Sequence, residues 1–470
     1  MEEKYVDFHK KRMYIFSELV KRYWNGKLNN NTDLKDLAEE IKENYGFTEK
    51  DMPFIQDHIR LAMGQDPKGN DTFEGELDMI RRSREIKKPA VSRVSGPCES
   101  CEGEKCSCET LGKYESSLYI KQGETDHKNE ECIQCGFCAS NCDFGAIAEK
   151  IEFLPVIELL KSEEMPVYAV VAPAIAGQFG ANVSMGQLRA AFQKMGFADM
   201  IEVALFADIL TIKEAFEFNH LVKREDDFFL TSCCCPVWFN LIRKNYPDIY
   251  EHLSPSVSPM IASGRILKRL YPNAKVVFFA PCIAKKSEAL EEELKGAVDY
   301  VVNFNELQEI FHALEINLDE IQPVEKDQAS LGGRLYARTG GVSFSVKSVV
   351  NRLDPTRVIK LRSQKVSGVK ECRDRLEALR SGGKGIANFI EGMGCKGGCV
   401  GGPRTNMDTG RATELVNEFG EDSFILTPFD NLNAIKILKH FEIERIEEIT
   451  NNEELKKILS RTESPHREQL

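Results

Sequence analysis

Three consecutive cysteines occupy residues 233–235, and this run constrains the chain more than any other feature. Neighbouring side chains diverge in extended and in helical backbone, so the three thiols cannot all bind one metal or share one disulfide. We therefore expect one metal ligand here, with a neighbouring thiol in a different role. Two further cysteine motifs follow, PCIAKK at 281–286 and EGMGCKGGC at 391–399. Together the three motifs supply four candidate thiolates, the number that holds a cubane iron–sulfur cluster: Cys235, Cys282, Cys395 and Cys399.

In this order, the motifs TSCCCPVW, PCIAKK and EGMGCKGGC resemble the three signatures of the iron-only (FeFe-type) hydrogenases. The resemblance extends from about residue 168 to about residue 435. In that family, one cysteine bridges a 4Fe–4S cubane to a two-iron subsite with carbonyl, cyanide and dithiolate ligands. The resemblance implies that Cys235, Cys282 and Cys395 bind the cubane alone and that Cys399 provides the bridge. The implied reaction is the reversible reduction of protons to dihydrogen.

Eight cysteines precede this region and form two groups of four. The second group has the CxxCxxCxxxC spacing of bacterial ferredoxins and comprises Cys132, Cys135, Cys138 and Cys142. Asp143 stands where proline usually follows this run. The first group is irregular and comprises Cys98, Cys101, Cys106 and Cys108. We expect two accessory 4Fe–4S clusters, with zinc as the alternative for either group and with the partition of ligands between the two clusters left open.

Composition restricts the class of protein. A chain of 470 residues is too long for one ordinary core, so we expect two or three domains. The formal net charge of −12 argues against a nucleic-acid partner. The chain has no apolar run of about 18 residues and begins without a signal-peptide pattern, so we expect no membrane insertion and a cytoplasmic location. In such a chain, 15 cysteines indicate metal binding or redox chemistry more than disulfides.

The order of the sequence patterns predicts four segments. Residues 1–92 show helical spacing and form a helical N-terminal module, and residues 93–160 form a small ferredoxin-like two-cluster domain. Apolar runs such as VYAVVAPAIAG, AKVVFFAPC and VDYVVNF then alternate with helical stretches, which favours an α/β two-lobed catalytic domain with parallel sheets over 161–435. Cysteine-bearing loops at the strand ends would face one cleft. Residues 436–470 form a charged helical tail that we expect to fray.

The resemblance also implies a path for protons. Cys234 corresponds to a thiol that hands protons to the dithiolate, and an unperturbed thiol pKa of about 8.5 suits proton exchange. Glu214 and Glu217, at positions i and i+3 on one helical face, correspond to two relay glutamates, and Ser254 corresponds to the hydroxyl between them. Without the resemblance, Cys234 would be interpreted as an inert buried thiol and the two glutamates as exposed helix residues.

The outer end of this relay departs from the family pattern. The family has an arginine one turn after the second glutamate, and Leu221 occupies that position here. Lys223 and Arg224 follow within one further turn, and we expect one of them to replace the arginine.

The resemblance implies five residues around the two-iron subsite: Pro173, Ala174, Pro281, Lys285 and Met393. Lys285 matches a lysine that pairs with a cyanide ligand, because a buried anion needs a cationic partner. Met393 matches a methionine packed beside the subsite. Ala174 stands where a serine usually contacts the other cyanide, and this departure indicates a divergent subgroup.

These patterns predict an enzyme that exchanges electrons with ferredoxin or a similar small carrier through the accessory clusters, and that needs cluster-maturation proteins. The basic run at 81–93 is either a docking patch for that carrier or a solvated helix face. Two other classes stay open: a hydrogen or redox sensor on the same core, and a noncatalytic hydrogenase-like iron–sulfur assembly protein. The complete third motif argues against the assembly protein, as do Lys285, Met393 and Cys234.

Overall fold

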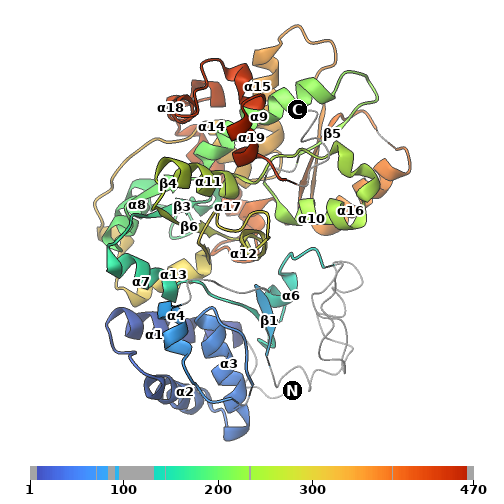
Figure 1. Ribbon diagram of the computed structural model, residues 1–470. Coiled ribbons are helices and arrows are strands. Elements are labelled where there is room, and N and C mark those ends of the chain that lie inside the picture. The colour runs from blue at the N-terminus through green and yellow to red at the C-terminus, as the bar shows by residue number, and fades with distance from the viewer. Residues whose placement is uncertain are drawn as a thin grey trace.

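The computed structural model describes most of the chain, namely residues 8–69, 71–82, 90–94, 132–142, 144–231, 234–383 and 385–462. The first cysteine group lies outside these ranges, as do Cys233 and most of the basic run at 81–93. Figure 1 shows the order of the helices and strands. In the described ranges, no helix is long and apolar enough to cross a membrane.

The N-terminal part is helical, as the sequence predicts. Its helices are α1 (Phe8–Trp24), α2 (Asn31–Tyr45), α3 (Met52–Ala62) and α4 (Glu76–Arg82). The side chain of Asn30 caps α2, and Gly46 ends it in the left-handed conformation. Helix α1 packs against α13 (Phe304–Ala313), so the blue helices in Figure 1 join the hydrophobic core of the α/β part. The sequence indicates no role for these helices.

A small two-stranded sheet connects the helical part to the α/β part. Strand β1 (Val91–Arg93) pairs antiparallel with β2 (Ile147–Glu149). The short helix α6 (Phe137–Ser140) lies within the second cysteine group, and α7 (Leu154–Ser162) follows β2. Cys138 and Cys142 pack in one apolar cluster with Ile283. This cluster holds the second cysteine group against the loop that carries Cys282.

The first lobe contains a sheet of four parallel strands in the order β4-β3-β6-β7. These strands are β3 (Val167–Val171), β4 (Asp199–Glu202), β6 (Lys275–Ala280) and β7 (Tyr300–Asn303). The helices α8 (Met185–Lys194), α11 (Pro259–Leu270), α12 (Ile283–Ala289) and α13 connect or flank them. All three apolar runs noted in the sequence form strands of this sheet, so the predicted parallel α/β arrangement is confirmed.

The second lobe contains three parallel strands in the order β5-β9-β8. They are β5 (Phe229–Leu230), β8 (Ser363–Ser367) and β9 (Phe389–Met393), with α10 (Pro236–Asn245), α15 (Gly341–Leu353) and α16 (Val369–Arg380) around them. Helix α10 approaches β9 closely because Gly392 in β9 and Gly394 just after it have no side chain. A Cβ on Gly392 would lie 2.2 Å from the Trp238 ring, and one on Gly394 would lie 2.6 Å from Val237.

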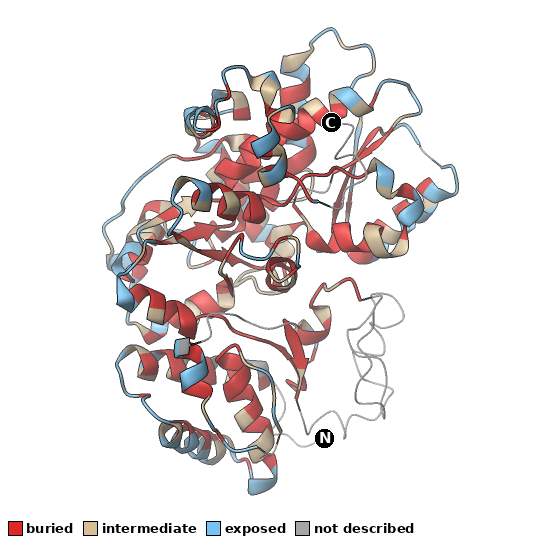
Figure 2. Cartoon of the chain, in the orientation of Figure 1, coloured by how far each residue is buried: buried red, intermediate tan, exposed pale blue. Residues whose placement is uncertain are grey.

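Helix α9 (Ala204–Leu221) is apolar on nearly every side and runs through the interior. Further helices are α14 (Leu331–Arg334), α17 (Thr409–Glu421), α18 (Leu432–Lys439) and α19 (Glu453–Leu459). Short 3-10 helices are η2 (Glu49–Asp51), η4 (Pro173–Ile175), η5 (Pro247–His252), η6 (Leu318–Glu320), η7 (Leu335–Ala337), η8 (Cys399–Gly401), η9 (Pro428–Asp430) and η10 (Ile446–Thr450). In Figure 2, buried residues fill the strands and inner helices, and exposed residues concentrate on the outer loops.

The C-terminal segment is packed as far as Thr462, so the expectation of a frayed tail is wrong for this part. Helix α19 packs against α11. The buried Arg461 pairs with three carboxylates, those of Glu288, Glu291 and Glu293. These charges anchor the chain end beside α12.

Candidate active site

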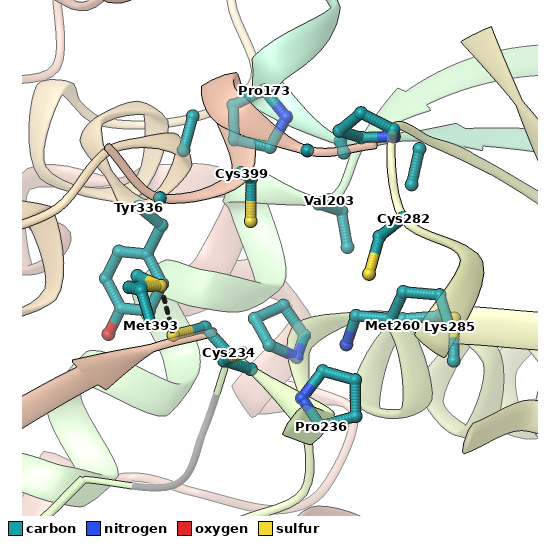
Figure 3. A pocket seen from close by; sticks show the side chains of 18 of the residues that line it. Pro173, Val203, Cys234, Pro236, Met260, Cys282, Lys285, Tyr336, Met393 and Cys399 are labelled. Carbon is teal, nitrogen blue, oxygen red and sulfur yellow. Dashed lines mark hydrogen bonds between the residues drawn. The ribbon is translucent and has the colours of Figure 1, made fainter. Parts of the chain in front are cut away.

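A pocket with an empty volume of about 800 Å3 lies where the loops from both sheets meet. The loops after β5, β6 and β9 each bring cysteine to it, and the loop after β3 brings Pro173. Open α/β sheets place their ligands at the carboxyl ends of the strands in this way. In Figure 3, the sulfur atoms of Cys234, Cys282 and Cys399 and the ammonium nitrogen of Lys285 face a common space.

Local structure places each of the four candidate ligands. Cys235 and Cys282 occupy the N-cap positions of α10 and α12, directly where each helix begins. Cys395 follows β9 by two residues, and Cys399 begins the 3-10 helix η8. The backbone N–H of Gly394 donates to the Sγ of Cys235 over 3.2 Å, which brings the first and third motifs together. All four predicted cubane ligands line the same pocket.

Three thiols of this pocket, those of Cys282, Cys395 and Cys399, are hard to ionise by themselves. Burial, and then the neighbouring thiolates, raise the pKa of Cys282 to about 11 and that of Cys399 to about 12, and the pKa of Cys395 lies well above its ordinary value. Bound iron would offset this by supplying the missing positive charge, and metal ligation deprotonates thiols. In the described ranges, no three His, Cys, Asp or Glu side chains converge on a position for a single metal ion. The set of four cysteine donors fits a cluster.

Lys285 presents a fixed positive charge to this pocket. Its Nζ donates to the Oε2 of Glu288 over 2.6 Å, and both side chains are buried. Burial lowers the pKa of Lys285, but the Glu288 carboxylate and the thiolates of Cys282 and Cys399 outweigh burial, so the pKa is raised. The side chain therefore stays an ammonium, which suits an anionic ligand of a bound cofactor.

Cys234 and Met393 meet across the pocket. The Sγ of Cys234 lies 3.8 Å from the Sδ of Met393, as the dashed line in Figure 3 marks. Behind Met393, the Sγ of Cys372 on α16 donates to the Met393 carbonyl oxygen over 3.4 Å. Cys372, for which the sequence suggested no role, thus supports the backbone of β9.

The residues predicted to surround the two-iron subsite are only partly brought together. Pro173, Pro281, Lys285 and Met393 line the pocket. Ala174 is fully buried in η4 and does not line it, so the placement of Ala174 beside the cofactor is corrected. Its carbon side chain turns into the core instead.

Both predicted relay glutamates are buried in α9, so the alternative that they are exposed helix residues is wrong. The Oγ1 of Thr231 donates to both carboxylate oxygens of Glu214, each over 2.9 Å. The Oγ of Ser254 donates to the Oε2 of Glu217 over 2.8 Å. Buried carboxylates need such partners, and the predicted Ser254 contact with Glu217 is present.

Lys223 and Arg224, the two candidates for the outer end of the relay, both lie at the surface, and their role stays a prediction. Arg224 pairs with Asp227 at the surface and its side chain is 74% exposed. Glu217 instead pairs with the buried Lys213, which also donates to the Oγ of Ser256 over 2.9 Å. The sequence held a signal for this contact, because a lysine in a helix that is apolar on nearly every side must find a buried partner.

Tyr336 also lines the pocket, and the sequence carried no signal for it. It lies in η7, outside the cysteine motifs, and its hydroxyl is 2.7 Å from the Oγ1 of Thr211 on α9. This contact fixes the ring against the wall of the pocket, opposite Cys282.

The second cysteine group lies directly beside this pocket. Its four cysteines are all buried. Cys135 lines the pocket itself and shares an apolar cluster with Cys235 and Cys282. The Nζ of Lys244 on α10 donates to the carbonyl oxygen of Cys132 over 2.7 Å. The fold thus brings two sets of four cysteines into contact.

The family model "Iron only hydrogenase large subunit, C-terminal domain" matches residues 165–403. The NADP-reducing hydrogenase subunit HndD of Solidesulfovibrio fructosivorans is 26% identical over 58% of this chain and 55% of its own. Iron hydrogenase 1 of Clostridium pasteurianum is 25% identical over 55% of this chain and 53% of its own. The chain thus spans about half the length of these two relatives. A probable cytosolic Fe–S cluster assembly factor of Drosophila grimshawi is 22% identical over 75% of this chain and 88% of its own.

Solved structures share the fold. The FeFe-hydrogenase HydA(deltaEFG), from a study of stepwise H-cluster assembly, superposes with a TM-score of 0.54 at 20% identity, over 65% of this chain and 98% of that one. A variant of FeFe-hydrogenase HydA1 from Chlamydomonas reinhardtii gives 0.53 at 19% identity, over 65% of this chain and 97% of that one. The low identities fit a divergent member. With its cysteine pocket and two parallel sheets, the chain belongs to the family of the iron-only hydrogenase large subunit, C-terminal domain.

Proposed function

We propose that this protein is an iron-only hydrogenase that catalyses the reversible combination of two protons and two electrons into dihydrogen. The observation that carries the proposal is the pocket itself, where four partly buried cysteines, the Lys285 ammonium and the additional Cys234 thiol line the same space. A cluster held by cysteines alone would need no such ammonium and no additional thiol.

In this proposal, one set of pocket residues binds the metal cofactor and a second set surrounds it. Cys235, Cys282, Cys395 and Cys399 would hold a 4Fe–4S cubane, and Cys399 would also hold a two-iron subsite with carbonyl, cyanide and dithiolate ligands. When bound, that group supplies the open iron position at which dihydrogen chemistry takes place. Lys285 orients an anionic ligand by its charge. Pro173, Pro281 and Met393 exclude water from the pocket by their apolar surface.

Protons are proposed to move between the pocket and the interior through the chain's own groups. Cys234 holds an exchangeable proton at the pocket wall. Glu214 is oriented by Thr231, and Glu217 is oriented by Ser254. Both carboxylates are buried, which keeps bulk water away from them. This assignment gives Cys234, Glu214, Ser254 and Glu217 the role of the proton path.

Electrons are proposed to enter through the accessory clusters of a ferredoxin-like domain. Cys132, Cys135, Cys138 and Cys142 would hold the nearer cluster, and the position of Cys135 on the pocket wall supports transfer to the cubane. The first cysteine group would hold the more distant cluster. Ferredoxin or a similar carrier would supply the electrons, cluster-maturation proteins would build the cofactor, and a cytoplasmic location is part of this proposal.

An infrared spectrum tests the proposal. The protein is matured anaerobically with the dedicated assembly machinery, and hydrogen uptake and evolution are assayed on the same sample. We expect carbonyl and cyanide bands that shift under hydrogen, together with turnover. Bands without appreciable turnover would favour a hydrogen or redox sensor instead.

The second candidate is a noncatalytic iron–sulfur assembly protein. One observation favours it: relatives named as cytosolic Fe–S cluster assembly factors align over 75% of this chain, against 58% for the hydrogenase subunit HndD. The same sample decides between the two. Bound iron and sulfide without any carbonyl or cyanide bands, alongside a known hydrogenase that matures normally, would support the assembly protein and refute the hydrogenase.

A further inference from the structure

We propose that Lys213 is the positioning residue for Glu217 and supplies the cationic partner at the Glu217 end of the proton path. The inference rests on the proposed function, because it assigns a role to Glu217 in proton transfer. It replaces the expected surface arginine or lysine by a cation buried within the fold.

The contacts around Lys213 form a closed network. Lys213 pairs with the Oε1 of Glu217 one turn later on α9, and its Nζ donates to the Oγ of Ser256 over 2.9 Å. Ser254 donates to the other oxygen of Glu217 over 2.8 Å. The backbone N–H of Ser256 donates to the Oγ of Ser254 over 3.1 Å. Each group in the network therefore limits the orientation of the next.

Burial makes this network selective for a cation at position 213. The side chains of Lys213 and Glu217 are only 3% and 1% exposed. A carboxylate removed from water needs a paired charge, and an unpaired one becomes protonated. Lys213 compensates the charge of Glu217 at Oε1 and leaves Oε2 facing Ser254. The Oε2 of Glu217, which faces the path, therefore remains able to accept a proton.

The C-terminal segment covers this network. Ser256 and Ser460 form an antiparallel bridge, and the N–H of Val257 donates to the Leu459 carbonyl over 2.9 Å. The N–H of Arg461 donates to the carbonyl of Pro255 over 2.8 Å. The segment around Ser460 is thus tied by its backbone to the stretch that carries Ser254 and Ser256, and Lys213 is 3% exposed.

The first test needs no hydrogen turnover. Protein that carries its iron–sulfur clusters but lacks the two-iron subsite is titrated in an infrared cell, and the carboxyl band of Glu217 is assigned by its loss in Glu217→Gln. We expect Lys213→Met to move the protonation midpoint of that band upward by at least one pH unit, a tenfold change, because the compensating ammonium is gone. Lys213→Arg should leave the midpoint near that of the wild type.

A matched control separates positioning from general damage. Lys286 forms a similarly buried pair with Glu306 over 2.6 Å, so Lys286→Met should lower stability without moving the Glu217 band. If Lys213→Met fails to fold, Lys213→Gln carries the same measurement. An unchanged band in the Lys213 variants would overturn the inference, and so would an equal shift in Lys286→Met.

Turnover provides the second readout. In matured protein, Lys213→Met should lower kcat for hydrogen evolution at least about tenfold, leave KM for the electron donor unchanged and alter the pH profile, and Lys213→Arg should restore the rate. A matured wild type with no turnover would refute the proposed hydrogenase function but leave the infrared result on Lys213 standing. The two failures are therefore distinguishable.

Discussion

Arg404 donates to both carboxylate oxygens of Glu149, with its Nε 2.6 Å from Oε1 and its Nη2 2.9 Å from Oε2. Arg404 follows the pocket cysteine Cys399, and Glu149 ends β2 after the second cysteine group. Arg12 on α1 also pairs with Glu149, over 3.3 Å. One buried carboxylate therefore joins the N-terminal helices, the second cysteine group and the pocket.

Loss of this shared carboxylate should destabilise the fold more than loss of either arginine. Glu149→Gln leaves Arg12 and Arg404 buried without their common anion, and breaking such a buried pair costs about 3–5 kcal/mol. Arg404→Gln should cost less, because Arg12 still pairs with Glu149. Chemical unfolding under anaerobic conditions measures both variants. Arg352→Gln, at a solvent-exposed pair, is the control and should behave like the wild type. Equal losses for the two buried variants would contradict this interpretation.

Cys234 should be required for turnover but not for cluster binding. Cys234→Ala removes the exchangeable proton at the pocket wall, so hydrogen evolution should fall by about 100-fold or more while iron and sulfide content stays unchanged. Cys372→Ala is a matched control, because Cys372 is also a buried cysteine but donates to the Met393 backbone and does not line the pocket. Near-normal turnover of Cys234→Ala with an intact cofactor would refute the proton-transfer assignment.

The hydroxyl of Ser254 should be required for the full rate of hydrogen evolution. Ser254→Ala removes the donor to Glu217 and interrupts the path, so the rate of hydrogen evolution should fall at least about tenfold. Ser254→Thr keeps a hydroxyl and should retain more activity. Ser263→Ala, which removes a buried serine that donates to the Met260 carbonyl over 2.6 Å, should leave the rate unchanged. Similar rates for Ser254→Ala and Ser263→Ala would exclude Ser254 from the path.

Glu152 should make stability depend on pH. Burial raises the pKa of this carboxyl from 4.5 to about 7 in the folded protein. The folded state then binds the proton more tightly than the unfolded chain does, so the free energy of unfolding falls as pH rises from about 4.5 to about 7.

Glu152→Gln removes this titration while keeping an oxygen that can accept from the Val301 N–H. The variant should gain up to about 3 kcal/mol of stability relative to the wild type between pH 5 and pH 8. Unfolding curves of both proteins at the two pH values measure the difference. A constant difference across that range would show that Glu152 does not titrate as described.

Local patterns in the sequence were sufficient to predict the features of this protein that are formed by residues close together along the chain. The spacing of Cys132 to Cys142 and the motifs around Cys235, Cys282 and Cys395 were enough to group the candidate cluster ligands, because ligands on short loops keep their relative positions in any fold that holds them. Apolar runs and helical periodicity were enough to predict the strands of the first sheet, since these patterns reflect which face of an element is buried.

Contacts between distant segments could be found only in the tertiary structure. Arg404 and Glu149 are 255 residues apart along the chain, and Lys213 and Ser256 are 43 residues apart. The sequence showed that Leu221 interrupts the family pattern, but not that Lys213 pairs with Glu217. The apolar character of α9 predicts that it is buried, but not which residue packs against each of its side chains. The partner of a buried charge is decided by how the lobes close, because only then does that charge lose its water.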